Sequence, residues 1–224
     1  MLGAPPESSS SRNGGVAVSV ANLSRPGPEA FQSRQSHGLE QFFGAIADLQ
    51  GFPVLDLAGA SQLNITFITN AGFRLYSDDF VRSLENAFGT GEEFLANQSD
   101  PDRVARFMSM ALDFPANHFC GALLWDTLQF LAQPLLQDTV DQLYEILAPG
   151  AYMFAMFHAD ERASAAPVYS YRIADSKNIL IAARGDRRPA QFFNNRNIEK
   201  VFQRFHSVKF FLTRDSLREI IVRR

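Results

Sequence analysis

The sequence predicts an α/β fold with a doubly wound, mostly parallel sheet. Three observations favour this fold. Short apolar runs alternate with helical patterns through most of the chain, and the first run enters a turn of small residues, Ala58–Ser61. The last two runs are separated only by Thr213–Ser216, too few residues for a parallel crossover. We therefore expect a seven-stranded sheet that ends in an antiparallel C-terminal hairpin, with a further β-hairpin inserted at 166–190.

Two N-terminal segments precede the first strand. Residues 1–28 are rich in Ser, Gly and Pro and hold too little apolar surface to fold, so we expect a disordered tail ahead of one domain at 29–224. Residues 37–50 carry apolar side chains at helical spacing, which predicts an amphipathic helix that ends at Gly51.

The nucleotide-like unit comes next. Val54–Leu57 is a short apolar run typical of a buried parallel strand, and the small-residue turn and a helical segment follow it. After Gly72 a second strand, Phe73–Tyr76, leads to Asp78 and Asp79. A strand, a tight turn, a helix and a strand that ends in an acid form the layout of a domain that holds an adenosine-type cofactor.

The rest of the chain first alternates helices and strands and then, towards its end, has strands joined by short turns. We expect a helix at 79–88, strands at 120–125 and 152–157, and between them a long helix broken by Pro134 and closed by Pro149-Gly150. Residues 104–110 fit either a short strand or the end of a helix. Further expected elements are a hairpin of strands 168–173 and 178–183, a helix at 197–205, and strands at 208–212 and 217–222.

Composition narrows the class of protein. Hydrophobic residues make up 46% and charged residues 20%, as in a soluble globular protein. The net charge of −3 argues against nucleic acid as a partner. A single cysteine, Cys120, excludes an internal disulfide and suits a cytoplasmic location, and no apolar run approaches the ~20 residues that span a bilayer. The 21 Phe residues indicate a Phe-rich core or, alternatively, an aromatic pocket for an apolar substrate.

Four segments together resemble a class I S-adenosylmethionine-dependent methyltransferase over roughly residues 37–224. Residues 54–62 (VLDLAGASQ) resemble its first motif, a strand that ends in an acid and enters alternating glycines. Residues 75–79 (LYSDD) resemble its second strand, 112–126 (LDFPANHFCGALLWD) the segment into its fourth, and 147–154 (LAPGAYMF) the Pro-Gly turn into its fifth. The resemblance implies a Rossmann-like domain with S-adenosyl-L-methionine as cofactor.

The resemblance also assigns cofactor contacts. It places the turn backbone against the methionine moiety, Asp56 near its amino group, and Asp79 or alternatively Asp78 on the ribose diol, although each acid could instead cap a helix. Gln62 stands where the family has a glycine, and Met110 stands where the family often has an acid that binds the adenine amino group. The expected cofactor residues are Asp56, Ala58, Gly59, Ala60, Asp79, Met110 and Trp125.

Catalytic candidates lie after the fourth and fifth strands, where the carboxyl ends of parallel strands meet. Asp126 and His158 occupy these places, with Asp126 equally suited to cap its helix. Methyl transfer from a sulfonium depends chiefly on alignment, and a base is needed only where the acceptor loses a proton. The four histidines are not spaced as a metal set, so no metal is expected.

Two functions remain open at this stage. The first is methyl transfer to a small-molecule acceptor, with the 166–190 hairpin as a substrate lid. The second is a catalytically inactive methyltransferase-fold protein that serves in binding or assembly, since Ala58, Ala60 and Gln62 replace family glycines. The hairpin could equally extend a sheet edge or form a homodimer surface, and the methyl acceptor is not named by the sequence.

Overall fold

The computed structural model of the chain describes residues 30–159, 164–211, 213 and 217–224. The predicted tail at 1–28 lies outside the described residues, as does all of the predicted 213–216 turn except Thr213. The elements in chain order are β1 (Gln32–Gln35), α1 (His37–Ala45), β2 (Pro53–Asp56), α2 (Gln62–Asn70), β3 (Arg74–Ser77), α3 (Phe80–Phe88), α4 (Glu93–Asn97), α5 (Pro101–Met108), β4 (Phe119–Trp125), the 3₁₀ helix η1 (Thr127–Phe130), α6 (Gln133–Ile146), β5 (Leu147–His158), β6 (Ala166–Ile173), β7 (Asn178–Arg187), α7 (Asn195–Val201), β8 (Ser207–Phe211) and β9 (Leu217–Arg223).

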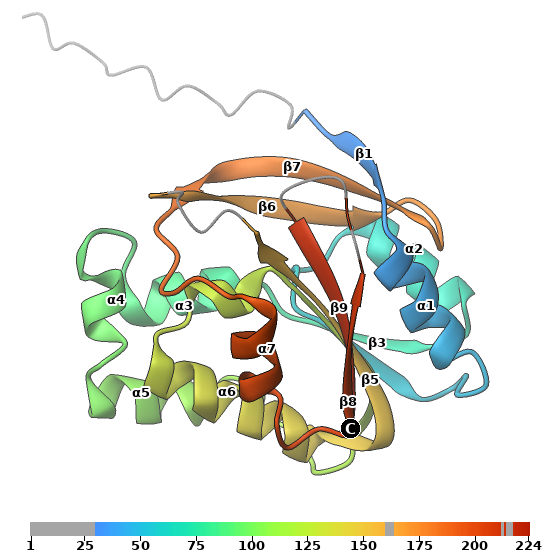
Figure 1. Cartoon of the computed structure of the whole chain (residues 1–224). Helices are drawn as coiled ribbons and strands as arrows, with labels where there is room; N and C mark the ends of the chain where they lie inside the picture. Colours follow the sequence, from blue (N-terminus) through green and yellow to red (C-terminus); the bar gives the residue numbers. More distant parts are fainter. Residues whose placement is uncertain (1–29, 160–163, 212, 214–216) are drawn as a thin grey trace, which may run out of the picture.

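A mostly parallel sheet forms the centre of the molecule, with the strand order β3-β2-β4-β5-β9-β8 (Figure 1). The first four of these strands are parallel to one another, whereas β9 is antiparallel to both β5 and β8. The predicted antiparallel pairing of the last two strands is therefore confirmed. A mixed α/β fold with a central, mostly parallel sheet is the architecture that the apolar runs predicted.

The central sheet has six strands within the described residues, so the expectation of seven was wrong. The segment that the sequence left open between strand and helix forms α5. Asp100 caps this helix by accepting hydrogen bonds from the backbone N–H groups of Asp102 and Arg103, and Pro101 occupies its first turn. Among the described residues no strand therefore lies beyond β3, and β3 is an edge strand of the sheet.

Each face of the central sheet packs against a separate apolar core. Alternate residues of β5 show the division, because Met153 and Phe157 belong to the core under α3, α5 and α6, whereas Phe154 and Met156 belong to the core under α1 and α2. Side chains of β6 and β7, Tyr171 among them, pack into the second core. No helix among the described residues is long and apolar enough to cross a bilayer.

The helix after β4 begins later than expected. Residues Thr127–Phe130 form η1, and Pro134 lies in the first turn of α6 rather than within a longer helix. The helix ends at Ile146, and Pro149-Gly150 belongs to the irregular start of β5 instead of forming the helix cap. Gly150 has a φ of 81°, a conformation that glycine adopts without strain.

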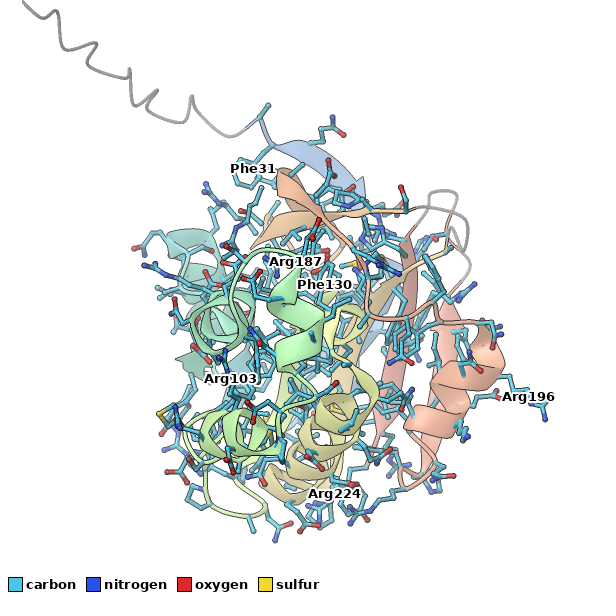
Figure 2. The ribbon with its side chains drawn as sticks, turned by 90° about the vertical axis from the view of Figure 1, so that its left-hand side faces the viewer. Phe31, Arg103, Phe130, Arg187, Arg196 and Arg224 are labelled. Carbon is cyan, nitrogen blue, oxygen red and sulfur yellow. The ribbon has the colours of Figure 1, made fainter. Side chains whose placement is uncertain are left out.

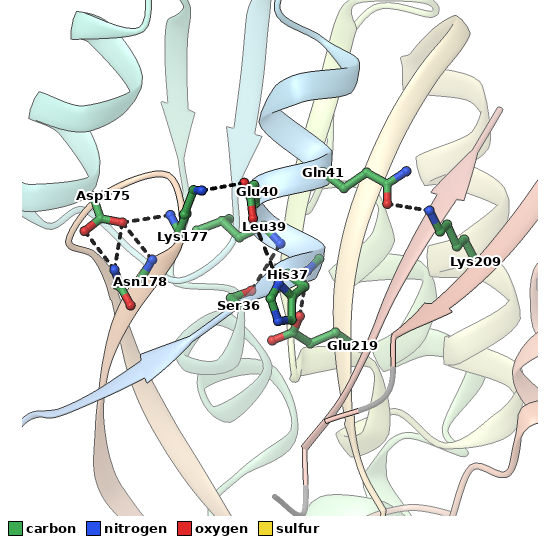
Figure 3. A network of polar contacts seen from close by, with 11 residues as sticks. Ser36, His37, Leu39, Glu40, Gln41, Asp175, Lys177, Asn178, Lys209 and Glu219 are labelled. Atoms are coloured by element: carbon green, nitrogen blue, oxygen red, sulfur yellow. Dashed lines mark hydrogen bonds and ion pairs between the residues drawn. The ribbon is translucent and has the colours of Figure 1, made fainter. Parts of the chain in front are cut away.

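A second sheet of three strands, in the order β1-β7-β6, lies over one end of the central sheet (Figure 1). Strands β6 and β7 pair antiparallel from Ala166–Arg187 to Ile173–Ile179, and β1 pairs antiparallel with β7. We call β6, β7 and the residues between them the hairpin. Several contacts hold β1 and the hairpin turn to the rest of the domain, and Figure 3 shows those that join the start of α1 to the hairpin turn, to β8 and to β9.

Glu219 of β9 is the centre of that attachment. It is fully buried, forms an ion pair with Arg34 of β1, and accepts a hydrogen bond of 2.7 Å from the backbone N–H of Gly38. Lys177 of the hairpin turn forms a 3.0 Å ion pair with Glu40 of α1. The second sheet is thus joined to the central one by a buried ion pair as well as by apolar packing.

Candidate functional site

Asp56 ends β2 at the centre of the expected site, and it is fully buried. Its Oδ1 accepts hydrogen bonds from Trp125 Nε1 at 2.7 Å and from the backbone N–H of Ala58 at 3.1 Å, and its Oδ2 accepts one from Asn64 Nδ2 at 2.7 Å. Burial raises the pKa of Asp56, and these three bonds partly offset the rise. Both carboxyl oxygens are therefore bonded to groups of the chain itself.

Trp125 is the last residue of β4, and its side chain lies next to Asp56 in the expected site. Its φ of 53° is in the left-handed region, which a bulky residue occupies only where its surroundings hold it there. The indole donates its N–H to Asp56 and stacks on Tyr171 of the hairpin, with ring centroids 4.7 Å apart and planes inclined by 13°. Only 1% of Trp125 is exposed, so the indole is part of the core.

The small-residue turn packs against the end of β3. Gly59 has a φ of 84°, and its N–H donates to the carbonyl of Asp78. A Cβ at Gly59 would lie 3.1 Å from the Cβ of Asp79, and Ala58 forms an isolated β-bridge with Asp79. Glycine is thus required at position 59 by backbone conformation and by close packing, whereas Ala60 is exposed.

Asp79 makes two contacts within the chain. Its Oδ1 accepts a hydrogen bond from the backbone N–H of Arg82, and Asp79 is thereby the N-cap of α3. Its Oδ2 lies 3.4 Å from Nη2 of Arg184, a residue of β7. This arrangement matches the alternative role of Asp79 as a helix cap, and the ion pair also ties the hairpin to the expected ribose-binding acid.

Asp126 and His158 meet behind the hairpin, as their positions at two strand ends predict. Asp126 Oδ2 lies 3.7 Å from His158 Nε2, and both residues are buried. The atoms Asp126 Oδ2, Gln129 Nε2, His158 Nε2 and the Tyr171 hydroxyl form no hydrogen bond with the described residues. Burial raises the pKa of Asp126, with a partial offset from His158 and Tyr171, and burial also raises that of Tyr171, whose hydroxyl faces the Asp126 carboxyl.

The space left between these groups is small. We call it the crevice; its cavity has a volume of about 10 Å³ and is lined by Leu57, Ala58, Asp79, Val81, Trp125, Asp126, Thr127, Tyr169, Tyr171 and Arg184. A cavity of this size has room for about one water molecule, whereas ligand pockets enclose roughly 300–1,000 Å³. A ligand the size of S-adenosyl-L-methionine therefore does not fit within the crevice in this conformation, in which Trp125 and Tyr171 form part of the lining.

The predicted site residues are only partly brought together. Ala58, Asp79, Trp125 and Asp126 line the crevice, and Asp56 lies behind it. Met110 is 69% exposed and lines a different groove. Gln62 lies in the exposed first turn of α2, where its Nε2 donates to Thr66 Oγ1. No metal-binding group of three or more His, Cys, Asp or Glu side chains occurs in the described part of the chain.

Sequence reasoning missed Asn64. Its side chain donates to Asp56 and accepts a 2.8 Å hydrogen bond from the backbone N–H of Ile173 in the hairpin. Asn64 thereby joins the first strand of the nucleotide-like unit to a segment more than 100 residues away. A polar residue on a helix carries no local signal of such a contact, although its place on the same helix face as the buried Ile68 is a weak one.

The chain matches no protein-family model and no curated protein. Solved structures that it resembles are S-adenosylmethionine-dependent methyltransferases, the family that its motifs resemble. One from Archaeoglobus fulgidus is 10% identical over 83% of this chain and 91% of that chain, with a TM-score of 0.47. One from Methanosarcina mazei is 12% identical over 78% and 93%, with a TM-score of 0.44.

The 1,6-didemethyltoxoflavin-N1-methyltransferase of Burkholderia thailandensis is a further neighbour. It is 13% identical over 84% of this chain and 78% of that chain, with a TM-score of 0.45. Its structure contains 1,6-didemethyltoxoflavin and S-adenosylhomocysteine. At these identities the likeness concerns the fold, and what the neighbour binds is a property of that protein.

Proposed function

We propose that this chain is a catalytically inactive methyltransferase-fold protein, a binding or assembly module in which the hairpin takes the place of the cofactor. The observation that carries the proposal is the closed crevice, where Tyr171 stacks on Trp125 and leaves about 10 Å³. The hydrogen bonds of Asp56 support it, because three internal donors occupy most of the acceptor capacity of this fully buried carboxyl group.

Opening the crevice would require several contacts to break together. The hairpin is held by the Trp125–Tyr171 stack, by Asn64, and by the ion pair between Arg184 and Asp79. An exposed ion pair contributes little, but a buried aromatic stack and a buried amide network are costly to separate. The closed form is therefore expected to dominate in solution.

The second candidate is methyl transfer from S-adenosyl-L-methionine to a small-molecule acceptor, with the hairpin as a lid that opens. The observation that favours it is the buried polar set of Asp126, His158 and Tyr171 at the strand ends, in which Asp126 Oδ2, His158 Nε2 and the Tyr171 hydroxyl form no hydrogen bond with the described residues. In an open form the adjacent Asp126 and His158 would face an acceptor, and His158 could take a proton from it. Buried polar atoms that lack a hydrogen bond are costly to a protein that never uses them.

Isothermal titration calorimetry with S-adenosyl-L-methionine and with S-adenosylhomocysteine separates the two candidates. The first predicts no binding heat at millimolar ligand, for the natural chain and for a Tyr171→Phe variant that keeps the stacked ring. Saturable binding by the natural chain would overturn the first candidate and favour the second. A thermal-shift measurement with the same ligands serves as an independent check, since a ligand of the folded state raises Tm.

The setting of this proposed module is also an expectation. A cytoplasmic location, a second copy of the chain as partner through the hairpin, and no nucleic acid partner belong to the proposal. The net charge of −3 supports the last of these. Light scattering of the purified chain tests the homodimer, and a monomer at all accessible concentrations would exclude it.

A further inference from the structure

A second, larger hollow lies between α3 and α5, and we call it the α3–α5 groove. It has a volume of about 620 Å³, within the range of ligand pockets. It shares no lining residue with the crevice, and of the residues expected to hold a cofactor only Met110 borders it. The groove is lined by Ser77, Asp78, Ser83, Asn86, Ala87, Arg103, Arg106, Phe107, Met110, Ala111, Leu112, Asp113 and Phe114.

The position of the groove follows from the fold. It opens where Ser77 ends the edge strand β3, and the chain between α3 and β4 folds into helices instead of covering this edge. Leu112 has a φ of 56°, a conformation that accompanies the sharp turn of the chain along the groove wall after α5. The hollow is thus enclosed by two helices and a turn, and it does not depend on the position of the hairpin.

One wall of the groove carries positive charge. Arg103 and Arg106 lie one helical turn apart on α5, and Arg103 forms a 3.5 Å ion pair with Asp100. Arg106 forms no ion pair with any residue that the structure describes, and its side chain is exposed to the groove and to solvent. A guanidinium presents two parallel N–H donors that match a carboxylate, so Arg106 is suited to bind one.

The floor and rim of the groove are apolar. Phe107 is 3% exposed at the base, and the partly buried Phe114 lies beside it. Met110 is 69% exposed at the rim, which is the largest exposure among the large apolar side chains of the described chain. Methionine is flexible and polarisable and packs well on flat ring faces, so this surface fits an aromatic body.

The opposite wall limits the charge of a ligand. Asp78 is half-buried there and accepts a 3.4 Å hydrogen bond from Ser83 Oγ, with Ser77 and Asn86 beside it. Burial raises the pKa of Asp78. A carboxyl group on this wall disfavours a second anionic group and accepts a hydroxyl or amino donor.

We propose that the α3–α5 groove binds a small aromatic monoanion, with its carboxylate on Arg106 and its ring against Phe107 and Met110. This site shares no lining residue with the crevice, although Met110 is one of the residues expected to contact a cofactor. A hydroxyl or amino group on the ring would reach the wall of Asp78 and Ser83. No group of the ligand needs to react, and the groove acts as a recognition site.

The test uses sodium salicylate as the probe and salicylamide as its uncharged match, each titrated into ¹⁵N-labelled protein and followed by two-dimensional NMR. We expect saturable shifts for salicylate that concentrate in α3, α5 and residues 110–114, and at least about fivefold weaker binding of salicylamide. Arg106→Gln should weaken salicylate binding by at least about fivefold.

Arg196→Gln is the matched control, because Arg196 is an exposed arginine of α7 and lies far from α5 (Figure 2). It should leave salicylate binding unchanged. The proposal is overturned if no saturable shift appears, if the shifts lie outside the groove, or if salicylamide binds as well as salicylate. It is also overturned if Arg106→Gln, shown to be folded by its own spectrum, binds like the natural chain.

Discussion

Replacement of Asp56 by Ala tests whether this acid serves the fold. The substitution leaves two buried donors without an acceptor, Trp125 Nε1 and Asn64 Nδ2. Each such orphaned group costs about 1–3 kcal/mol. The Asn64 amide keeps a long contact of 3.4 Å to the Tyr171 carbonyl, which offsets a part, so we expect a loss of about 3–4 kcal/mol in the free energy of unfolding.

Urea denaturation followed by tryptophan fluorescence measures this loss, because Trp125 is the single tryptophan and lies at the site. Trp125→Phe removes the indole N–H and keeps a ring, and unfolding of that variant is followed by circular dichroism. The double-mutant cycle of Asp56→Ala and Trp125→Phe should give a coupling of about 1–2 kcal/mol. A loss below about 1 kcal/mol for Asp56→Ala, with no coupling, would refute the structural role and favour an acid held free for a ligand.

Three further perturbations follow from the same structure. Asp126→Asn removes an acid whose pKa is raised by burial. Such an acid binds its proton more tightly in the folded state than in the unfolded state. Its stabilising contribution is therefore greatest below the unfolded pKa of about 4 and is lost as pH rises through the folded pKa. The variant should therefore gain stability relative to the natural chain as pH rises above about 4, measured as urea midpoints; a growing deficit with pH would contradict this. Glu219→Ala removes the buried carboxylate that pairs with Arg34 and accepts from the Gly38 N–H, and it should cost about 3 kcal/mol; unchanged amide exchange in β1 would count against the ion pair as its anchor. Gly59→Ala forces a left-handed Ala against Asp79 and should lower stability by about 1–2 kcal/mol, whereas an unchanged Tm would show that the turn can rearrange.

The central strands β2 and β4 were predictable because each is a short apolar run that the sheet buries on both faces. Val54–Leu57 and Cys120–Trp125 have almost no polar residues, and they fall on β2 and β4 within one residue. The antiparallel end of the sheet was predictable because the length of a connection limits its direction. These signals are local in the sequence, so they can be recognised without knowledge of the rest of the fold.

The number of strands was not predictable in the same way. Residues 104–110 are mostly apolar without a clear period of two, whereas Val104 and Phe107 are three residues apart and face one side of α5. The deciding signals are Asp100 as an N-cap and Pro101 in the first turn, which together begin a helix. Their effect is to replace a seventh strand and to leave the α3–α5 groove beside β3.

The packing position of the hairpin could not be predicted from the sequence, for a different reason. Its strands could be recognised from their pattern, but the place where they pack depends on contacts with residues more than 40 positions away, such as Tyr171 with Trp125. Phe, Tyr and Trp bury large areas wherever they pack, so composition alone does not tell a pocket lined by aromatic side chains from one filled by them. The sequence therefore indicated aromatic side chains near the site without showing that they close it.

The altered glycine motif and the closed crevice have separate physical causes. Gln62 points along the exposed side of α2 toward Thr66, and Ala60 is exposed, so neither substitution narrows the crevice. The obstruction comes from Trp125, held in a left-handed conformation by its bond to Asp56, and from the tyrosine that stacks on it. Restoring glycine at position 62 would leave both rings in place. If the proposed function holds, the hairpin rather than Gln62 limits cofactor binding, and binding would require the hairpin to open as a unit.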